Sequence, residues 1–253
     1  MKRMAKVGEM SRFNLLLCLL VAVSVLMMIS ANPRILAAVI NCVPLTQCIG
    51  TNSHDTINGS NENDKMTGLG GKDKMSGNNG SDVMFGGDGI DNINGGDGVN
   101  DFIDGEAGND VLSGGASTDS ISGGTGNDII NGDEGFDDLH GYLGSDTIHG
   151  GTEDDMVQGS QGNDKLFGDD GNDRLVGDAN SITVGNFGAD NLNGGPGDDL
   201  LFQAQYEIFS GGQPLEPDGN KDILDCGDGN DEAFVNVNTD HDVFKNCEVV
   251  HKG

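Results

Sequence analysis

The sequence has few aromatic and few basic residues, and both shortages limit what the protein can be. Its 253 residues include no Trp and only 2 Tyr, and aromatic residues make up 5% of the chain. Lys and Arg number 13 against 42 Asp and Glu, for a net charge of −29. A large mixed core is therefore not expected, and nucleic acid is excluded as a partner because phosphate binding needs a basic face. Such an excess of acidic residues is typical of a protein that binds multivalent cations, or of a solvated, disordered chain.

The sequence also lacks the motifs of common catalytic and metal sites. It contains no nucleophile elbow, no HExxH motif and no P-loop. Asp218, Asn220 and Asp222 match the first three ligand positions of an EF-hand, but Ile223 stands where that loop needs Gly. The five His residues are scattered, which argues against a zinc site. We therefore predict that the protein is not an enzyme.

The N-terminus differs in kind from the rest of the chain. A basic start over residues 2–12 precedes an almost wholly apolar run over residues 13–29, and small residues follow. This order is typical of a secretory signal peptide, with cleavage expected after Ala37 or Ala38, or at Ala31. The alternative is an uncleaved membrane anchor, because the run approaches spanning length. We expect a secreted, extracellular or cell-surface protein.

Removal of residues 1–38 changes both charge and cysteine content. The segment holds five basic residues and one acidic residue, so its loss takes the net charge from −29 to −33. Four cysteines then remain, and an even number in an exported chain suggests disulfides. Four cysteines allow three pairings. The pairing that is local in the sequence joins Cys42 to Cys48 and Cys226 to Cys247.

From Gly50 to Val176 the chain repeats every nine residues, in fourteen units of which only the sixth has a tenth residue. Position one is Gly in every unit, and position four is Gly in ten. Position six is always Asp and position eight is always a large apolar residue. Position two is Gly in only five units. Three columns in register over such a length cannot arise by chance, so the segment is a repeat array.

This pattern resembles the RTX, or haemolysin-type, calcium-binding nonapeptide GGxGxDxUx, in which U is a large apolar residue. The resemblance implies that the first six residues of a unit form a calcium-binding turn and the last three a short strand. It predicts an all-β fold, a parallel β-roll (β-solenoid) of tandem nonapeptide repeats. Multiple Ca²⁺ ions are the implied cofactor.

Elementary geometry agrees with the resemblance. Alternate side chains of a strand face opposite ways, so position eight points inward while positions seven and nine point outward. Gly at positions one and four is expected to allow a positive φ where the backbone turns. Such a turn aims carbonyl groups and the Asp carboxylate at one point, and calcium prefers six to eight oxygens of this kind.

Because one unit holds one turn and one strand, two units make a coil, and units two apart stack on the same edge. The resemblance implies that each calcium ion lies between stacked turns and takes oxygens from both aspartates. Seven turns on each edge leave six gaps, so the regular array holds at most twelve ions. The predicted ligands, including four in degenerate units, are Asp55, Asp64, Asp73, Asp82, Asp91, Asp101, Asp110, Asp119, Asp128, Asp137, Asp146, Asp155, Asp164, Asp173, Asp190, Asp199, Asp222 and Asp231.

The predicted organisation has five parts: a signal peptide (1–38), an N-terminal cap (39–49), the regular array (50–176), degenerate repeats (177–234) and a C-terminal cap (235–253). Two insertions, at 178–187 and 203–218, interrupt the degenerate repeats, and we expect both to be surface loops. Capped ends are expected because an open solenoid exposes its core.

These features favour a secreted calcium-binding β-roll that folds when Ca²⁺ binds between its Gly- and Asp-rich turns, with a structural or surface-interaction role. One alternative is an adhesin that binds an extracellular polysaccharide or ice, although position three varies too much for a flat repeating surface. The other is the accessory module of an extracellular enzyme, but only about eleven residues would precede the array in the mature chain.

Overall fold

A computed structural model describes residues 37–43, 47–178, 188–204, 221–235 and 242–252. The chain divides into residues Met1–Leu36, which lie outside the described residues, and a unit of residues Ala37–Gly253. The expected signal peptide therefore falls almost wholly outside what the structure describes. In the described ranges, no helix has the length and apolar character needed to cross a membrane.

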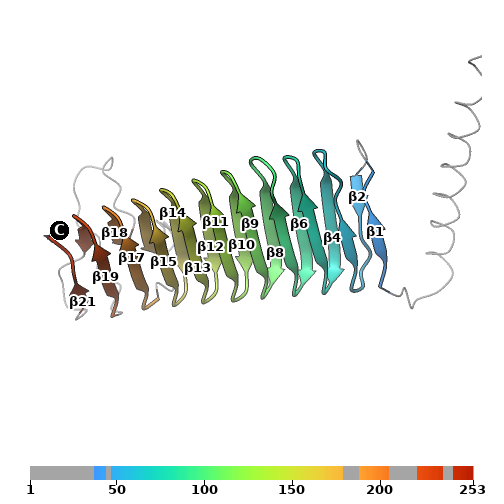
Figure 1. The fold of residues 1–253 in the computed structure, drawn as a ribbon. Coiled ribbons are helices and arrows are strands. Elements are labelled where there is room, and N and C mark those ends of the chain that lie inside the picture. Colours follow the sequence, from blue (N-terminus) through green and yellow to red (C-terminus); the bar gives the residue numbers. More distant parts are fainter. Residues whose placement is uncertain (1–36, 44–46, 179–187, 205–220, 236–241, 253) are drawn as a thin grey trace, which may run out of the picture. The chain divides into compact units, whose positions relative to one another are not determined.

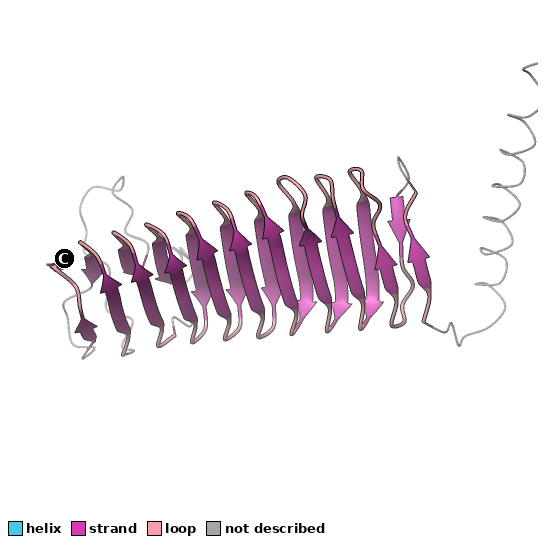
Figure 2. Cartoon of the chain, viewed as in Figure 1, coloured by secondary structure: helices cyan, strands magenta, loops and turns pink. Residues whose placement is uncertain are grey.

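The unit Ala37–Gly253 is a solenoid of two parallel sheets, between which the chain alternates strand by strand (Figures 1 and 2). Sheet A contains β1 (Val39–Asn41), β3 (Thr56–Asn58), β5 (Lys74–Asn78), β7 (Asn92–Gly96), β9 (Val111–Ala116), β11 (Ile129–Glu134), β13 (Thr147–Thr152), β15 (Lys165–Asp170), β17 (Asn191–Pro196), β19 (Ile223–Asp228) and β21 (Val243–Lys245). Sheet B contains β2 (Gln47–Ile49), β4 (Lys65–Gly71), β6 (Val83–Gly89), β8 (Phe102–Gly108), β10 (Ser120–Thr125), β12 (Asp138–Leu143), β14 (Met156–Gln161), β16 (Arg174–Asp178), β18 (Leu200–Ala204), β20 (Glu232–Val235) and β22 (Val249–Lys252). No helix occurs in the described ranges, and the predicted all-β parallel β-roll is confirmed.

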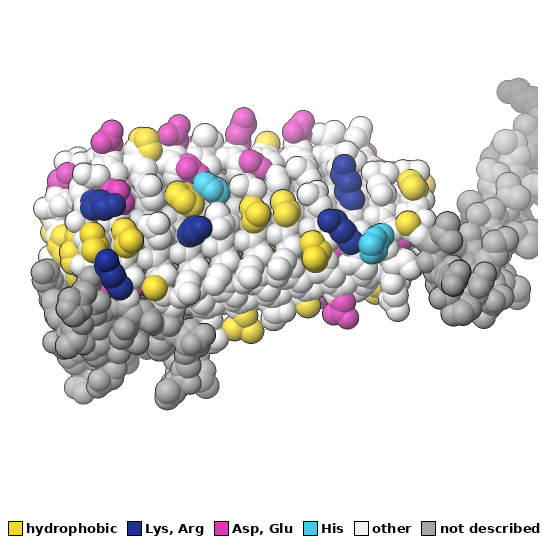
Figure 3. Space-filling view, turned by 90° about the horizontal axis from the view of Figure 1, so that it is seen from below, with side chains coloured by type: hydrophobic (Ala, Val, Ile, Leu, Met, Phe, Trp, Pro, Cys, Tyr) yellow, Lys and Arg dark blue, Asp and Glu magenta, His cyan; other side chains and the backbone are white. Residues whose placement is uncertain are grey.

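The core is a double column of position-eight side chains, one column from each sheet. In sheet B, Ile121 pairs with Ile103 on one side and Leu139 on the other, so every second unit stacks in register. From Ile57 to Leu175 each of these side chains is at most 1% exposed. Positions seven and nine point outward, and Figure 3 shows such side chains on one face, with acidic groups gathered along an edge. The alternation expected from strand geometry is therefore observed.

The strands are longer than the three residues that the family resemblance implied. Strand β9 begins at position seven and ends at position three of the next unit. This extension arises because residues after the apolar core also pair with the neighbouring coil, as Gly115 does with Gly96. The turn proper is thereby reduced to about positions four to six.

Disulfides Cys42–Cys48 and Cys226–Cys247 lie near the two ends of the solenoid, and the sequence-local pairing is confirmed. The chain leaves the described array after Asp178 and after Ala204. Asp178 and Gln203, which we expected in surface loops, are instead buried in β16 and β18. They occupy the first positions after the core, where backbone pairing with the neighbouring coil continues.

Aromatic stacking extends along the outer face of sheet B near the C-terminal end. The rings of Phe202 and Phe234 are parallel, with centroids 4.6 Å apart, and His251 stacks on Phe234 at 4.4 Å. The Arg174 guanidinium lies 4.1 Å from the Phe202 ring centroid. These contacts tie four strands together in the part of the array where the Gly-rich pattern is least regular.

Candidate metal centre

Each turn buries the carboxylate of its position-six Asp beside the apolar core. Asp119 is 2% exposed and Asp137 is 0% exposed, and both directly precede an outward-facing strand residue. The eighteen aspartates predicted as ligands are all buried in this way. A carboxylate removed from water requires donors or a cation, because its solvation is lost on burial.

Backbone donors satisfy one oxygen of most of these carboxylates. The Asp101 N–H donates to Asp119 Oδ1 at 2.7 Å, and the Asp119 N–H donates to Asp137 Oδ1 at the same distance. The bond repeats from coil to coil and produces two continuous rows, which we call the aspartate ladders. One ladder contains Asp55, Asp73, Asp91, Asp110, Asp128, Asp146, Asp164, Asp190, Asp222 and Asp242. The other contains Asp64, Asp82, Asp101, Asp119, Asp137, Asp155, Asp173, Asp199, Asp231 and Glu248.

The second oxygen of most ladder carboxylates is buried and accepts no hydrogen bond from the described residues. This holds for Oδ2 of Asp73, Asp82, Asp91, Asp101, Asp110, Asp119, Asp128, Asp137, Asp146, Asp155, Asp164, Asp173, Asp199 and Asp231. A buried anionic oxygen without a donor is strongly unfavourable. The same unmet oxygen recurs in turn after turn, so Oδ2 is the atom in each of these turns that is available to bind a cation.

The first two units differ from the others. The Thr51 N–H donates to Asp55 Oδ2 at 2.6 Å and the Thr51 hydroxyl donates at 2.9 Å. Ser60 makes the same two bonds to Asp64 Oδ2. In these two turns, groups of the protein take the role that a cation would have at Oδ2 elsewhere.

Position one is Gly for a steric reason rather than for its φ. A Cβ at Gly114 would lie 2.5 Å from Asp119 Oδ2 and 2.8 Å from the Gly132 carbonyl oxygen. The positive φ values fall at positions two and four, as at Gly124 (φ +102°) and Gly126 (φ +133°). The expectation of a positive φ at position one is therefore wrong. The carboxylate packs against the bare Cα of that Gly, so any side chain there would displace the ladder.

Burial raises the pKa of these carboxyl groups. The pKa of Asp119 rises to about 7 and that of Asp155 to about 8, mainly through desolvation. The N–H donated by the preceding coil lowers both pKa values, and the stacked carboxylates on either side raise them again. The turns thus favour neutralisation of the carboxylate by a proton or a cation.

The donor set available in a turn is of the kind that calcium prefers. No group of three or more His, Cys, Asp or Glu side chains that could hold a metal ion occurs in the part of the chain that the structure describes. A cation in a turn would therefore combine ladder carboxylates with backbone carbonyl oxygens. Hard oxygens in a flexible turn suit Ca²⁺ better than Zn²⁺, which prefers His and Cys.

The ladders include two carboxylates that sequence reasoning missed. Asp242 accepts a hydrogen bond from the Asp222 N–H at 3.0 Å, and Glu248 accepts one from the Asp231 N–H at 2.9 Å. The sequence does carry a sign of both ladder positions. Each acidic residue directly precedes a strand whose second residue is apolar, Phe244 after Asp242 and Val250 after Glu248. The signal was missed because no position-one Gly accompanies it.

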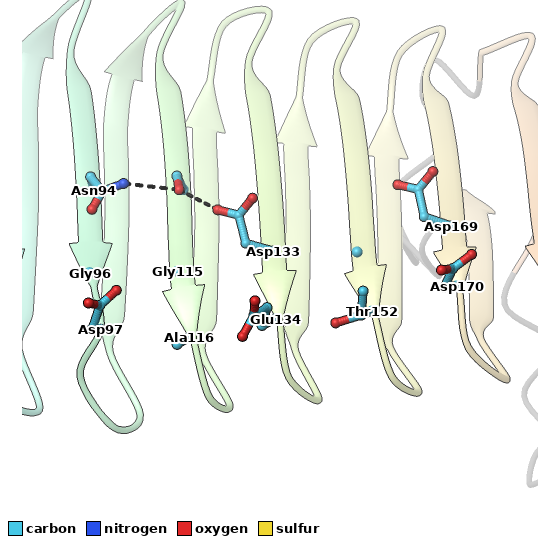
Figure 4. A pocket seen from close by; sticks show the side chains of 12 residues that line it. Asn94, Gly96, Asp97, Gly115, Ala116, Asp133, Glu134, Thr152, Asp169 and Asp170 are labelled. Carbon is cyan, nitrogen blue, oxygen red and sulfur yellow. Dashed lines mark hydrogen bonds between the residues drawn. The ribbon is translucent and has the colours of Figure 1, made fainter.

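A second acidic region lies outside the ladders. A groove of about 670 Å³ runs across β7, β9, β11, β13 and β15 of sheet A (Figure 4). Its carboxylates are Asp97, which follows β7, Asp133 and Glu134 of β11, and Asp169 and Asp170 of β15. Ser113 links Asn94 to Asp133 by hydrogen bonds. These carboxylates are exposed or only half-buried, so water satisfies them and they lack the unmet oxygen of the ladders.

The stacked turns define the class of protein: a β-solenoid that buries one carboxylate in each turn. A family model for the RTX calcium-binding nonapeptide repeat (4 copies) matches residues 49–84, 76–100, 85–121, 96–130, 122–157, 149–181 and 184–202. These matches cover more than half of the chain. The protein therefore belongs to the RTX calcium-binding nonapeptide repeat family. A search of curated proteins finds no match.

Proposed function

We propose that this protein is secreted and that its solenoid folds when Ca²⁺ binds in the turns of the aspartate ladders. The carrying observation is the buried Oδ2 of Asp73 and of thirteen further ladder aspartates, which accepts no hydrogen bond from the described residues. A divalent cation there supplies the missing partner and neutralises two stacked carboxylates. Binding free energy then becomes folding free energy.

The energetics of a single unit support dependence on calcium. Each unit buries only one large apolar side chain, so burial offsets only part of the conformational entropy lost when nine residues become ordered. Two carboxylates about 4.8 Å apart repel by roughly 3 kcal/mol at an effective dielectric of about 20. The calcium-free coil is therefore unfavourable at neutral pH.

Circular dichroism of the exported chain tests the proposal. In chelator the far-ultraviolet spectrum should be that of a largely disordered chain, and millimolar calcium should induce β structure. Magnesium should substitute poorly, because it demands tight octahedral geometry and keeps its waters. A spectrum that calcium leaves unchanged would contradict the proposal.

The N-terminal sequence and the cysteines support secretion. A basic start, an apolar run and small residues precede Val39, and both disulfides suit an oxidising compartment. Mass spectrometry of the exported protein should find a new N-terminus near residues 38–39. Retention of the apolar run in the exported protein would favour a membrane anchor instead.

The role that fits these features is structural or surface-interacting, with calcium ions as the direct ligands. Regular turns on both edges and outward-facing polar strands provide a long, stiff surface, whereas a β-roll is not a catalytic fold. Loss of surface attachment by the secreting cell when the gene is deleted, and its recovery with added protein and calcium, tests this role.

A further inference from the structure

Sulfur is concentrated at the N-terminal end of the core. Position eight is Met in three consecutive units, as Met66, Met75 and Met84, whereas the other regular units carry Ile, Leu or Val there. Met66 and Met84 are neighbours in sheet B, and Met66 also pairs with Cys48 of the Cys42–Cys48 disulfide. Strands β2, β4, β5 and β6 thus contribute sulfur atoms to the core at this end.

The three methionines are fully enclosed in the folded protein. Met66 and Met84 are 0% exposed and Met75 is 1% exposed. The side chains clustered with them are apolar. Met156, which points outward from β14, is 41% exposed. Oxidants therefore reach Met156 in the folded state but reach the other three only when the coils open.

We infer that Met66, Met75 and Met84 form an oxidation site that loss of calcium opens, and that their oxidation keeps the N-terminal coils from reforming. The inference rests on the proposed function, because calcium removal is what opens the coils. In the reaction, a thioether sulfur attacks one oxygen of a peroxide and the O–O bond breaks. An S–O bond forms and the sulfur loses two electrons, while the other peroxide oxygen takes up the proton of the transferred hydroxyl and leaves as water or an alcohol.

The product does not suit this core. A sulfoxide is polar and accepts hydrogen bonds, whereas the thioether that it replaces is apolar. When calcium returns, each sulfoxide oxygen would have to enter a column of apolar side chains. Because each coil of a solenoid is coupled mainly to its neighbours, the damage stays local. Strands β3–β7 should fail to close, while strands from β9 onward refold.

The test is peroxide treatment of the exported, processed protein in calcium, in chelator, and in denaturant as a fully open reference. Peptide mapping by mass spectrometry then measures the sulfoxide at each site. Met66, Met75 and Met84 should be protected by at least about tenfold in calcium relative to chelator. Met156 should differ by less than about twofold and is the internal control.

Refolding then tests the consequence. After peroxide in chelator, calcium should restore hydrogen-exchange protection in β9–β16 but not in β3–β7, and enzymatic reduction of the sulfoxides should restore the rest. A variant with Met66→Leu, Met75→Leu and Met84→Leu should refold fully after the same treatment, since Leu already occupies position eight in units such as those of Leu112 and Leu139. Met156→Leu should refold no better than the unaltered chain.

The two hypotheses fail in different ways. If calcium changes the circular dichroism spectrum but the three core methionines oxidise equally with and without it, the oxidation site is wrong. If the oxidised chain recovers protection in β3–β7, the consequence is wrong. If chelator changes neither the spectrum nor the protection of the methionines, calcium-dependent folding itself is wrong.

Discussion

The first two turns of the array and the turns that follow solve the same electrostatic problem in different ways. Asp55 lies at the start of a ladder, and both its oxygens accept hydrogen bonds from the protein, one from the Ala38 N–H and the other from Thr51. Asp73, one coil further on, has only one oxygen satisfied. The comparison shows that a buried carboxylate oxygen is left open to a cation only where the protein does not supply hydrogen-bond donors itself.

This difference also changes the expected number of ions. Counting stacked turns allows at most six ions on each edge of the regular array. Thr51 reduces the need for a cation in the first turn of one edge. On the other edge Ser60 satisfies Asp64 Oδ2, but Asp64 Oδ1 stays buried without a hydrogen-bond partner among the described residues. At the other end, Asp242 and Glu248 extend both ladders through the degenerate units. Asp222 lies in one ladder between Asp190 and Asp242.

The largest expected effect is that of pH on the turns from Asp73 onward. The pKa of Asp119 is about 7 and that of Asp155 about 8, both above the unfolded value near 4. The calcium-free coil therefore binds protons more tightly than the unfolded chain. This stabilisation is complete below about pH 4 and is lost as pH rises through about 6–8.

Acidification from pH 8 to pH 5 should accordingly induce β structure without calcium. Because protons compete for the same carboxylates, it should also weaken calcium binding to the folded coil by at least about tenfold. Circular dichroism at each pH without calcium measures the first change, and calorimetric calcium titration measures the second. A calcium-free chain that gains no β structure at pH 5 would show that carboxylate repulsion is not what opens the coil.

The next largest effect is expected from Asp119→Asn. The amide oxygen can still accept the Asp101 N–H, but the anionic ligand is lost, so the calcium midpoint should rise by about tenfold. Asp55→Asn is the matched control, since Thr51 already supplies two protein donors to Asp55 Oδ2. It should lower thermal stability with little change in the calcium midpoint. Equal calcium midpoints for the two variants would mean that protein donors to Asp Oδ2 do not reduce the role of calcium in a turn.

A smaller effect is expected from Gly68→Ala. The new Cβ would lie 2.4 Å from both Asp73 Oδ2 and the Gly86 carbonyl oxygen, so stability in calcium should fall by about 1–3 kcal/mol. Gly70→Ala, in the same strand, places its Cβ no closer than 3.4 Å to a neighbour and should change stability by less than about 0.5 kcal/mol. Thermal unfolding of both variants measures the difference. Similar losses of stability in the two variants would mean that the neighbouring Asp carboxylate is not the reason for Gly at position one.

The smallest effect is expected from Thr51→Gly. This change should convert a turn whose Asp Oδ2 has protein donors into a turn whose Oδ2 is open to a cation. Removal of the hydroxyl takes one of two donors from Asp55 Oδ2, and Gly allows the positive φ seen at position two of later units. Calorimetric titration should then count one more calcium ion than for the unaltered protein. An unchanged count would indicate that the Thr51 N–H alone keeps this turn closed to the cation.

Much of the fold could be predicted from the sequence because the repeat is strict. The stacking of Asp119 between Asp101 and Asp137 follows from two units per coil, and the structure has this arrangement. The local disulfide pairing was also predictable. The buried state of Asp178 and Gln203 was not, because their neighbours in sequence break the pattern while their backbone continues the strand.

The reason for Gly at position one could not be read from the sequence either. A Gly in a repeat can serve either a tight turn or the close approach of another group, and the sequence does not distinguish the two. Only the stacked coils show that the Asp carboxylate lies against the Cα of the position-one Gly. The roles of Thr51 and Ser60 were hidden for a similar reason. Position two varies along the array, and only the folded turn brings these hydroxyl groups to a carboxylate.

By itself, the sequence determined the period, the inward and outward faces of each strand, the two edges and the acidic residue of every turn. These properties are local, since they depend on side-chain alternation along a strand and on identical units that repeat in order. The tertiary structure alone decided which carboxylate oxygens have protein donors and how far the ladders continue. Those properties depend on contacts between residues about eighteen or more positions apart, which form only when one coil lies on the next.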